Sequence, residues 1–204
     1  MKQKKKNGGA LSSYLSRRWA EGKLAHIAPF LPSSGTILDI GSGTGAVSRI
    51  LKERGYIVSS VDVQDRSLVP EDAPILYDGA RLPFADSSFD SGLLLTVLHH
   101  TPNPVEVLCD AARVCRQIII IEDVYTNPVQ QHLTYFTDSL FNMEFRGHPH
   151  SNKTDSEWRE AFQDLGLRLT HAEQRKVLLV FRQYAYSLTV PKRPAESYTA
   201  GPTA

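Results

Sequence analysis

From residue 36 onwards, short β-rich apolar runs alternate with amphipathic helical patterns. The first run is residues 36–40, and residues 46–51 then place their apolar side chains on one helical face. Further apolar runs follow at residues 56–61, 74–77, 91–97 and 117–121. Such an alternation is typical of a parallel sheet covered by helices on both faces. We therefore expect one α/β domain.

The last part of the chain breaks this alternation. Two β-rich runs, at residues 167–171 and 176–188, leave no room for a helix between them. Strands joined so closely pair antiparallel, so we expect an antiparallel pair at the edge of the sheet. Before them, Thr154 and Glu157 have the spacing of a capping box and predict the start of a helix.

The remaining segments define the domain organisation. A single domain is expected over residues 10–190, with residues 10–30 helical in pattern and residues 125–150 rich in aromatic side chains. Both segments are placed to cover a cleft. Residues 1–9 are expected to be a basic, flexible tail and residues 191–204 a loose C-terminal tail.

Composition excludes several classes of protein. The 23 Lys and Arg residues nearly balance the 22 Asp and Glu residues, and four of the lysines lie in the N-terminal tail, so the body lacks the basic footprint of a nucleic-acid binder. Cys109 and Cys115 are too few for a disulfide framework. No apolar run approaches the length of a membrane span. We expect a cytoplasmic protein without a membrane span, for which nucleic acid is an improbable partner; the oligomeric state stays open.

A glycine-rich loop follows the first apolar run. Its sequence is Asp-Ile-Gly-Ser-Gly-Thr-Gly, residues 39–45. Glycines let the backbone approach a ligand closely, and the following helix N-terminus offers unpaired N–H donors. Because Gly41, Gly43 and Ala46 also satisfy the dinucleotide fingerprint, the loop alone leaves the kind of cofactor open.

Three aspartates narrow the choice of cofactor. Asp62 ends the second run, 21 positions after Gly41. A carboxylate at this place can accept both hydroxyls of a ribose, whether the cofactor is a dinucleotide or another adenosine compound. Asp39, within the loop, disfavours a pyrophosphate and suits a ligand that carries an ammonium and a sulfonium. Asp78, at the end of the third run, is placed to accept a hydrogen bond from an adenine amino group. Asp39 and Asp78 thus favour an adenosyl sulfonium compound.

With these residues the chain resembles the class I S-adenosylmethionine-dependent methyltransferases, in particular the small-molecule group that includes the ubiquinone/menaquinone C-methyltransferases. The resemblance covers about residues 35–125 and rests on residues 37–45, 61–62, 78–90 and 97–100. One departure is Cys-Arg-Gln at residues 115–117, where the family has a Leu-Lys-Pro-Gly-Gly turn. The resemblance implies a Rossmann-like, seven-stranded, mostly parallel sheet of order 3-2-1-4-5-7-6, with strand 7 antiparallel and helices on both faces.

The resemblance also implies that S-adenosylmethionine is the cofactor and S-adenosylhomocysteine its product. The implied cofactor residues are Asp39, Gly41, Gly43, Asp62, Asp78, Gly79 and Thr96. Among them, Asp62 would hold the ribose, and Asp78 with the backbone of Gly79 would hold the adenine. Asp39 would lie beside the amino acid end, where the backbone of Thr96 would contact the ammonium.

Methyl transfer from a sulfonium is an in-line displacement, so the enzyme must align the acceptor and, where the acceptor holds a proton, supply a base. His99 and His100 follow the fourth run at the rim of the expected cleft and are the candidate bases. The aromatic residues indicate a small, apolar or aromatic acceptor, with residues 125–150 as its lid. The candidate acceptor residues are Tyr14, Trp19, Tyr125, Tyr135, Phe136 and His148.

Two other functions stay open at this point. An NAD-type oxidoreductase would use the same glycine loop but would give Asp78 no role. A cofactor-binding protein without turnover, acting as a partner or regulator, would fit the lack of an unmistakable base. No metal is expected, because His132, His148 and His150 do not form a recognised ligand set.

Overall fold

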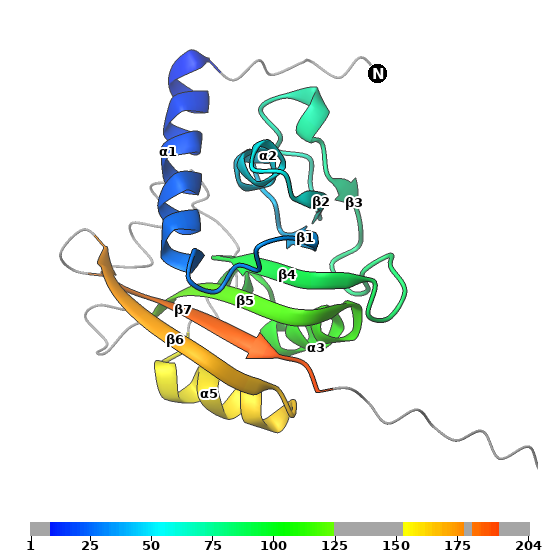
Figure 1. The fold of residues 1–204 in the computed structure, drawn as a ribbon, viewed down its shortest axis with the longest axis vertical. Helices are drawn as coiled ribbons and strands as arrows, with labels where there is room; N and C mark the ends of the chain where they lie inside the picture. Colours follow the sequence, from blue (N-terminus) through cyan, green and yellow to red (C-terminus); the bar gives the residue numbers. More distant parts are fainter. Residues whose placement is uncertain (1–8, 125–152, 178–180, 192–204) are drawn as a thin grey trace, which may run out of the picture.

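The computed structural model describes residues 9–124, 153–177 and 181–191. Both expected tails fall almost wholly outside these ranges, as do Tyr125, Tyr135, Phe136 and His148 of the expected lid. The described part forms one sheet with helices on both faces (Figure 1).

The sheet has seven strands in the order β3-β2-β1-β4-β5-β7-β6. The strands, in that order, are β3 (Ile75–Leu76), β2 (Ile57–Asp62), β1 (Thr36–Ile40), β4 (Phe89–Leu95), β5 (Cys115–Val124), β7 (Phe181–Thr189) and β6 (Arg168–Val177). All neighbours from β3 to β5 pair parallel, whereas β7 is antiparallel to both β5 and β6. The predicted strand order and the antiparallel pair are confirmed.

Two layers of helices cover the sheet. Helices α1 (Ala10–Ile27) and α2 (Ala46–Glu53) pack on one face, and α3 (Pro104–Val114) and α5 (Asp155–Asp164) pack on the other (Figure 1). Short 3-10 turns, η1 (Pro70–Asp72) and η2 (Leu98–His100), follow β2 and β4. The predicted capping box at the start of α5 is present, with Thr154 accepting from the Glu157 N–H.

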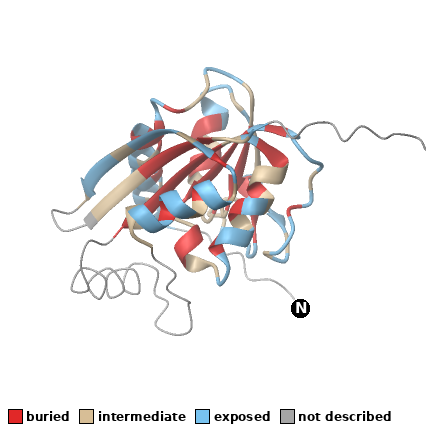
Figure 2. Ribbon diagram, turned by 90° about the horizontal axis from the view of Figure 1, so that it is seen from below, coloured by how far each residue is buried: buried red, intermediate tan, exposed pale blue. Residues whose placement is uncertain are grey.

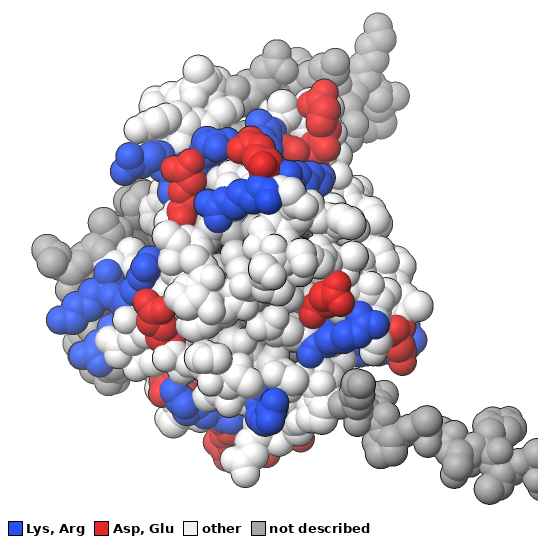
Figure 3. Space-filling view, in the orientation of Figure 1, with Lys and Arg blue, Asp and Glu red and all other residues white. Residues whose placement is uncertain are grey.

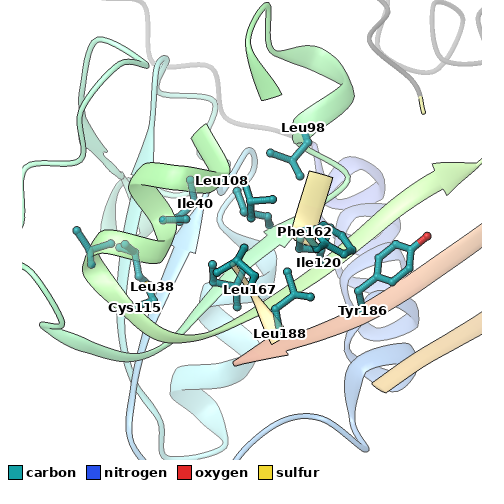
Figure 4. Packing of buried hydrophobic residues seen from close by; sticks show 14 of the residues in the cluster. Leu38, Ile40, Leu98, Leu108, Cys115, Ile120, Phe162, Leu167, Tyr186 and Leu188 are labelled. Atoms are coloured by element: carbon teal, nitrogen blue, oxygen red, sulfur yellow. The ribbon is translucent and has the colours of Figure 1, made fainter. Parts of the chain in front are cut away.

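The core follows from the two-residue period of the strands. In β5, Ile119 and Ile121 pack toward α1 and α2, while Ile118 and Ile120 pack toward α3 and α5. Figure 4 shows the second of these clusters, with Ile120 beside the side chains of α3, α5 and β7. Central strands buried on both faces explain the continuous apolar runs in the sequence, and they form the buried centre of Figure 2.

The strand ends differ from the predictions at the edges of the sheet. Strand β6 continues to Val177, beyond the predicted end at residue 171, because an edge strand with mostly exposed side chains gives no apolar pattern. Strand β3 is only two residues long, and both of its side chains are exposed. The segment predicted as helical over residues 10–30 is a helix only to Ile27. Cys109 lies on α3, whereas Cys115 is the first residue of β5.

The surface of the described residues carries both signs of charge. On the face shown in Figure 3, blue and red side chains alternate in small groups, without a broad basic area. Among the described residues, no helix combines the length and apolar character needed to cross a membrane.

Candidate cofactor site

A cavity of about 1970 Å³ opens where the carboxyl ends of the parallel strands meet α1. Ligands of open α/β sheets bind at this edge. The predicted residues that line it are Tyr14, Trp19, Gly41, Gly43, Asp62, Asp78, Gly79, Thr96, His99 and His100. The structure therefore gathers residues from five separate segments into one site, large enough for a cofactor beside an acceptor.

The glycine loop between β1 and α2 has its glycines at positive φ. Gly41 (φ 72°) touches the start of η2 so closely that a Cβ would lie 2.8 Å from both methyl carbons of Val97. At Gly43 (φ 55°) a Cβ would meet nothing within 4 Å. The loop thus presents open space toward the cavity at Gly43, where a ligand can approach the backbone.

The loop N–H groups are bonded within the protein. Gly41 and Ser42 donate to the Val61 carbonyl at 2.9 and 3.2 Å, and Gly45 donates to the Ser42 carbonyl at 3.0 Å. The Gly43 N–H donates to Asp62 Oδ2 at 2.8 Å. These four donors hold the loop in place rather than pointing at an anion.

Asp62 ends β2 beside this loop, as predicted. Besides Gly43, its carboxylate accepts from the Gln64 N–H at 3.2 Å through Oδ1. Each carboxylate oxygen can accept a second hydrogen bond, so both can still receive ribose hydroxyls. The side chain is buried yet lines the cavity, which fixes its orientation.

Asp78 lies beyond β3 in a tight turn. Its Oδ1 accepts from the N–H groups of Ala80 and Arg81 at 2.9 and 3.2 Å. These bonds hold the pKa of the Asp78 carboxyl below its usual value. Neighbouring Gly79 has φ 82°, and its backbone also lines the cavity. The exposed, ionised carboxylate is a ready acceptor at this end of the site.

Asp39 is buried and does not line the cavity, and its place beside the amino acid end of a cofactor stays a prediction. It is only 3% exposed, and its Oδ2 accepts from Ser48 Oγ at 2.7 Å. Burial raises the pKa of Asp39 to about 6, against the lowering effect of the Ser48 hydrogen bond and of Lys23. Asp39 can therefore act on a ligand through its charge.

Thr96 directly follows β4 and has φ 62°, in the left-handed region that β-branched residues avoid. Its N–H donates to the Ile121 carbonyl at 2.7 Å, which holds this conformation. Its hydroxyl oxygen accepts from Lys23 Nζ at 2.7 Å. Lys23 on α1 was not predicted from the sequence, because no local pattern distinguishes it from a surface lysine.

His99 is anchored inside the protein. Its ring is 2% exposed, and Nδ1 lies 2.5 Å from Glu122 Oε2. The other oxygen of Glu122 accepts from the N–H groups of Val97 and Leu98 at 3.1 and 2.8 Å. Glu122 thus fixes both η2 and the His99 ring. The half-buried His100 ring packs on that of His99, with centroids 4.0 Å apart.

Three further polar side chains line the cavity beside β5 and β7. Gln183 donates to Asp123 Oδ1 at 3.0 Å, and His26 is buried close to Gln183 and Glu173. Burial raises the pKa of Asp123, while His99 and Gln183 act to lower it. The position of Asp123 at the carboxyl end of a predicted strand could have revealed it, whereas nothing in the sequence pattern marks His26 or Gln183.

Within the described ranges, no three His, Cys, Asp or Glu side chains are grouped so that they could hold a metal ion. His132, His148 and His150 lie outside these ranges.

Comparison with known families decides the class of the domain. Residues 38–118 match the family model described as "Methyltransferase domain". The matched residues are thus similar to the methyltransferase domain family, in agreement with the class I S-adenosylmethionine-dependent resemblance of the sequence. The matched segment of the domain contains the glycine loop, Asp62, Asp78 and the turn after β4.

Curated relatives of this methyltransferase domain match over part of their length. A demethylmenaquinone methyltransferase of Tropheryma whipplei is 34% identical over 88 residues, which are 39% of this chain and 37% of the relative. A ubiquinone/menaquinone biosynthesis C-methyltransferase of Roseobacter denitrificans is 29% identical over 139 residues, 59% of this chain and 55% of the relative. The matches thus span between a third and somewhat over half of these relatives.

Solved structures share the fold of the methyltransferase domain. The magnesium protoporphyrin IX methyltransferase of Synechocystis, determined with bound S-adenosylhomocysteine, superposes with a TM-score of 0.61 at 15% identity. The superposition covers 92% of this chain and 90% of that one.

Proposed function

We propose that the protein binds S-adenosylmethionine in this cavity and transfers its methyl group to a small organic acceptor. The observation that carries the proposal is the order of Asp78, Asp62 and the open position at Gly43 along the cavity, where they follow β3, end β2 and follow β1. We assign the ribose to the Asp62 carboxylate and the adenine amino group to the Asp78 carboxylate with the Gly79 backbone beside it, because all three residues line the cavity.

The hydrogen bonds of the loop argue against a dinucleotide. A pyrophosphate is bound by unpaired backbone N–H groups at a helix N-terminus. Here the loop donors of Gly41, Ser42, Gly43 and Gly45 are already used within the protein, which leaves a pyrophosphate the first N–H groups of α2 but none from the loop glycines. The carboxylate of Asp39 beneath the loop would also repel the phosphates. An oxidoreductase of the NAD type is therefore disfavoured.

S-adenosylmethionine supplies an electrophilic methyl group whose bond to sulfur breaks as the acceptor bond forms, leaving the electron pair on sulfur. The protein's part is to align the acceptor and to exclude water. Tyr14 and Trp19 line the cavity from α1 and are 57% and 50% exposed. An apolar ligand in the cavity could cover these exposed aromatic side chains. We assign them to an apolar or aromatic acceptor.

His100, and less directly His99, are the proposed bases for an acceptor that carries a proton. His100 is half-buried at the cavity wall. His99 is tied to Glu122, so its first effect is on the position of η2. Residues 125–150 are proposed as the acceptor lid, with Tyr125, Tyr135, Phe136 and His148 as contacts.

The cysteines are consistent with a reducing compartment such as the cytoplasm, which we propose as the location. Cys109 and Cys115 are both free. Burial raises the pKa of the Cys115 thiol to about 12, so this thiol is unreactive.

Calorimetric titration with S-adenosylmethionine, S-adenosylhomocysteine and NAD tests the proposal. We expect micromolar binding of the two adenosyl sulfur compounds and none of NAD. Asp78→Ala should weaken that binding at least tenfold. Its matched control is Asp65→Ala, because Asp65 is also an exposed turn carboxylate, bonded to Ser67, but does not line the cavity. Binding of NAD, or of none of the three, would refute the proposal.

A further inference from the structure

Lys23 brings an ammonium group from α1 to a part of the cavity that the predicted cofactor residues leave unassigned. Its Nζ donates to the Leu95 carbonyl at 2.9 Å and to Thr96 Oγ1 at 2.7 Å. An ammonium has three N–H donors. Among the described residues, the Leu95 carbonyl and Thr96 Oγ1 are the two acceptors of Lys23. One donor remains for a ligand.

Three carboxylates act on this buried ammonium. Burial lowers the pKa of Lys23, but the carboxylates of Asp123, Asp39 and Glu122 act in the opposite direction. Both oxygens that Lys23 contacts belong to neutral groups, a carbonyl and a hydroxyl. A charged donor held by neutral acceptors forms its strongest further hydrogen bond with an anion.

The position of Lys23 fits one end of the proposed ligand. Asp78 follows β3, whereas Lys23 meets the end of β4, and three spacings of about 4.8 Å, or about 14 Å, separate these strands. A ligand whose adenine lies at Asp78 and whose ribose lies at Asp62 extends its amino acid end past Gly43 toward β4. The carboxylate is the only anionic group at that end.

We propose that Lys23 binds the carboxylate of the amino acid end of S-adenosylmethionine and S-adenosylhomocysteine. This inference rests on the proposed function. It adds a residue that binds the methyl donor and lies outside residues 38–118, the segment that matches the family model. Tyr14 and Trp19, which we propose for the acceptor, lie on the same helix as Lys23. Binding of the methyl donor to Lys23 would therefore also fix the helix that carries the acceptor side chains.

The test compares S-adenosylhomocysteine with 5′-methylthioadenosine, which has the adenosine and the sulfur but no amino acid. Lys23→Met keeps the length of the side chain and removes its charge, and Lys23→Arg keeps a charge. Lys52→Met, on the exposed face of α2, is the matched control. Affinities for both compounds are measured by calorimetry on the full chain.

We expect Lys23→Met to weaken S-adenosylhomocysteine binding by about tenfold to a hundredfold and to leave methylthioadenosine within about twofold. Lys23→Arg should recover part of the loss, and Lys52→Met should change neither affinity. Unchanged or tighter binding of S-adenosylhomocysteine to Lys23→Met would overturn the inference while leaving the proposed function intact. If the wild-type chain bound neither compound, the proposed function itself would fail.

Hydrogen exchange gives an independent readout of the same contact. S-adenosylhomocysteine should slow amide exchange in α1 of the wild-type chain but not of Lys23→Met, and methylthioadenosine should slow it in neither. Equal protection of α1 by the two compounds would contradict the role of Lys23.

Discussion

The two sides of the cavity are built in different ways. On the glycine-loop side, Asp78 is bonded to backbone N–H groups two and three residues away, and Asp62 to groups within 19 residues. On the Lys23 side, side chains meet across the fold: Lys23 and Thr96 are 73 positions apart, and Gln183 and Asp123 are 60 apart. The first side is a local motif, and the second exists only once the sheet has assembled.

The largest expected effect lies on the Lys23 side. Glu122→Ala would remove the buried carboxylate that the His99 ring and the Val97 and Leu98 N–H groups contact. We expect a loss of about 3–5 kcal/mol in the free energy of unfolding, measured by urea denaturation. Glu122→Gln, which keeps one acceptor oxygen, should lose less, and Glu53→Ala on the exposed surface should change little. An equal effect of Glu122→Ala and Glu53→Ala would show that this side is not held by buried charge.

On the glycine-loop side, two neighbouring glycines should separate folding from binding. Gly41→Ala adds a methyl group that meets Val97 in a left-handed backbone, so we expect a loss of about 2–4 kcal/mol in stability. Gly43→Ala meets open space and should cost about 1 kcal/mol. Thermal unfolding and calorimetry with S-adenosylhomocysteine check both. Gly43→Ala should keep the fold but weaken binding, and a Gly43→Ala protein that binds normally would show that the ligand does not approach there.

Asp39 lies between the two sides, and its effect depends on pH. Because its pKa is raised to about 6 in the folded protein, the charged form is less favourable there than in the unfolded chain. Its stabilising contribution is complete below the unfolded value of 3.8 and is lost as the pH rises through 6. Asp39→Asn should therefore gain up to about 2–3 kcal/mol over the wild type between pH 4 and pH 7. If the difference in the free energy of unfolding between Asp39→Asn and the wild type were constant across this pH range, the raised pKa of Asp39 would be refuted.

The contrast between the two sides also explains what could be predicted from the sequence. The strand order, the glycine loop and the places of Asp62 and Asp78 follow from short patterns, because the carboxyl ends of parallel strands always meet at one edge. The sequence did not predict the partner of Asp39: the strand alternation turns its side chain toward Ser48 of α2.

The remaining residues could not be read from local patterns. Lys23 lies on a helix whose other side chains are mostly exposed, and only the packing of α1 against β4 and β5 brings it to Thr96. The end of β6 was missed because an exposed edge strand carries polar residues.

The most direct test of the central claim is a crystal structure of the protein soaked with S-adenosylhomocysteine. We expect the adenine amino group within hydrogen-bond distance of Asp78, the ribose hydroxyls on Asp62 and the ligand chain passing over Gly43. Electron density for the adenosine anywhere else, with Asp62 and Asp78 uncontacted, would contradict the account.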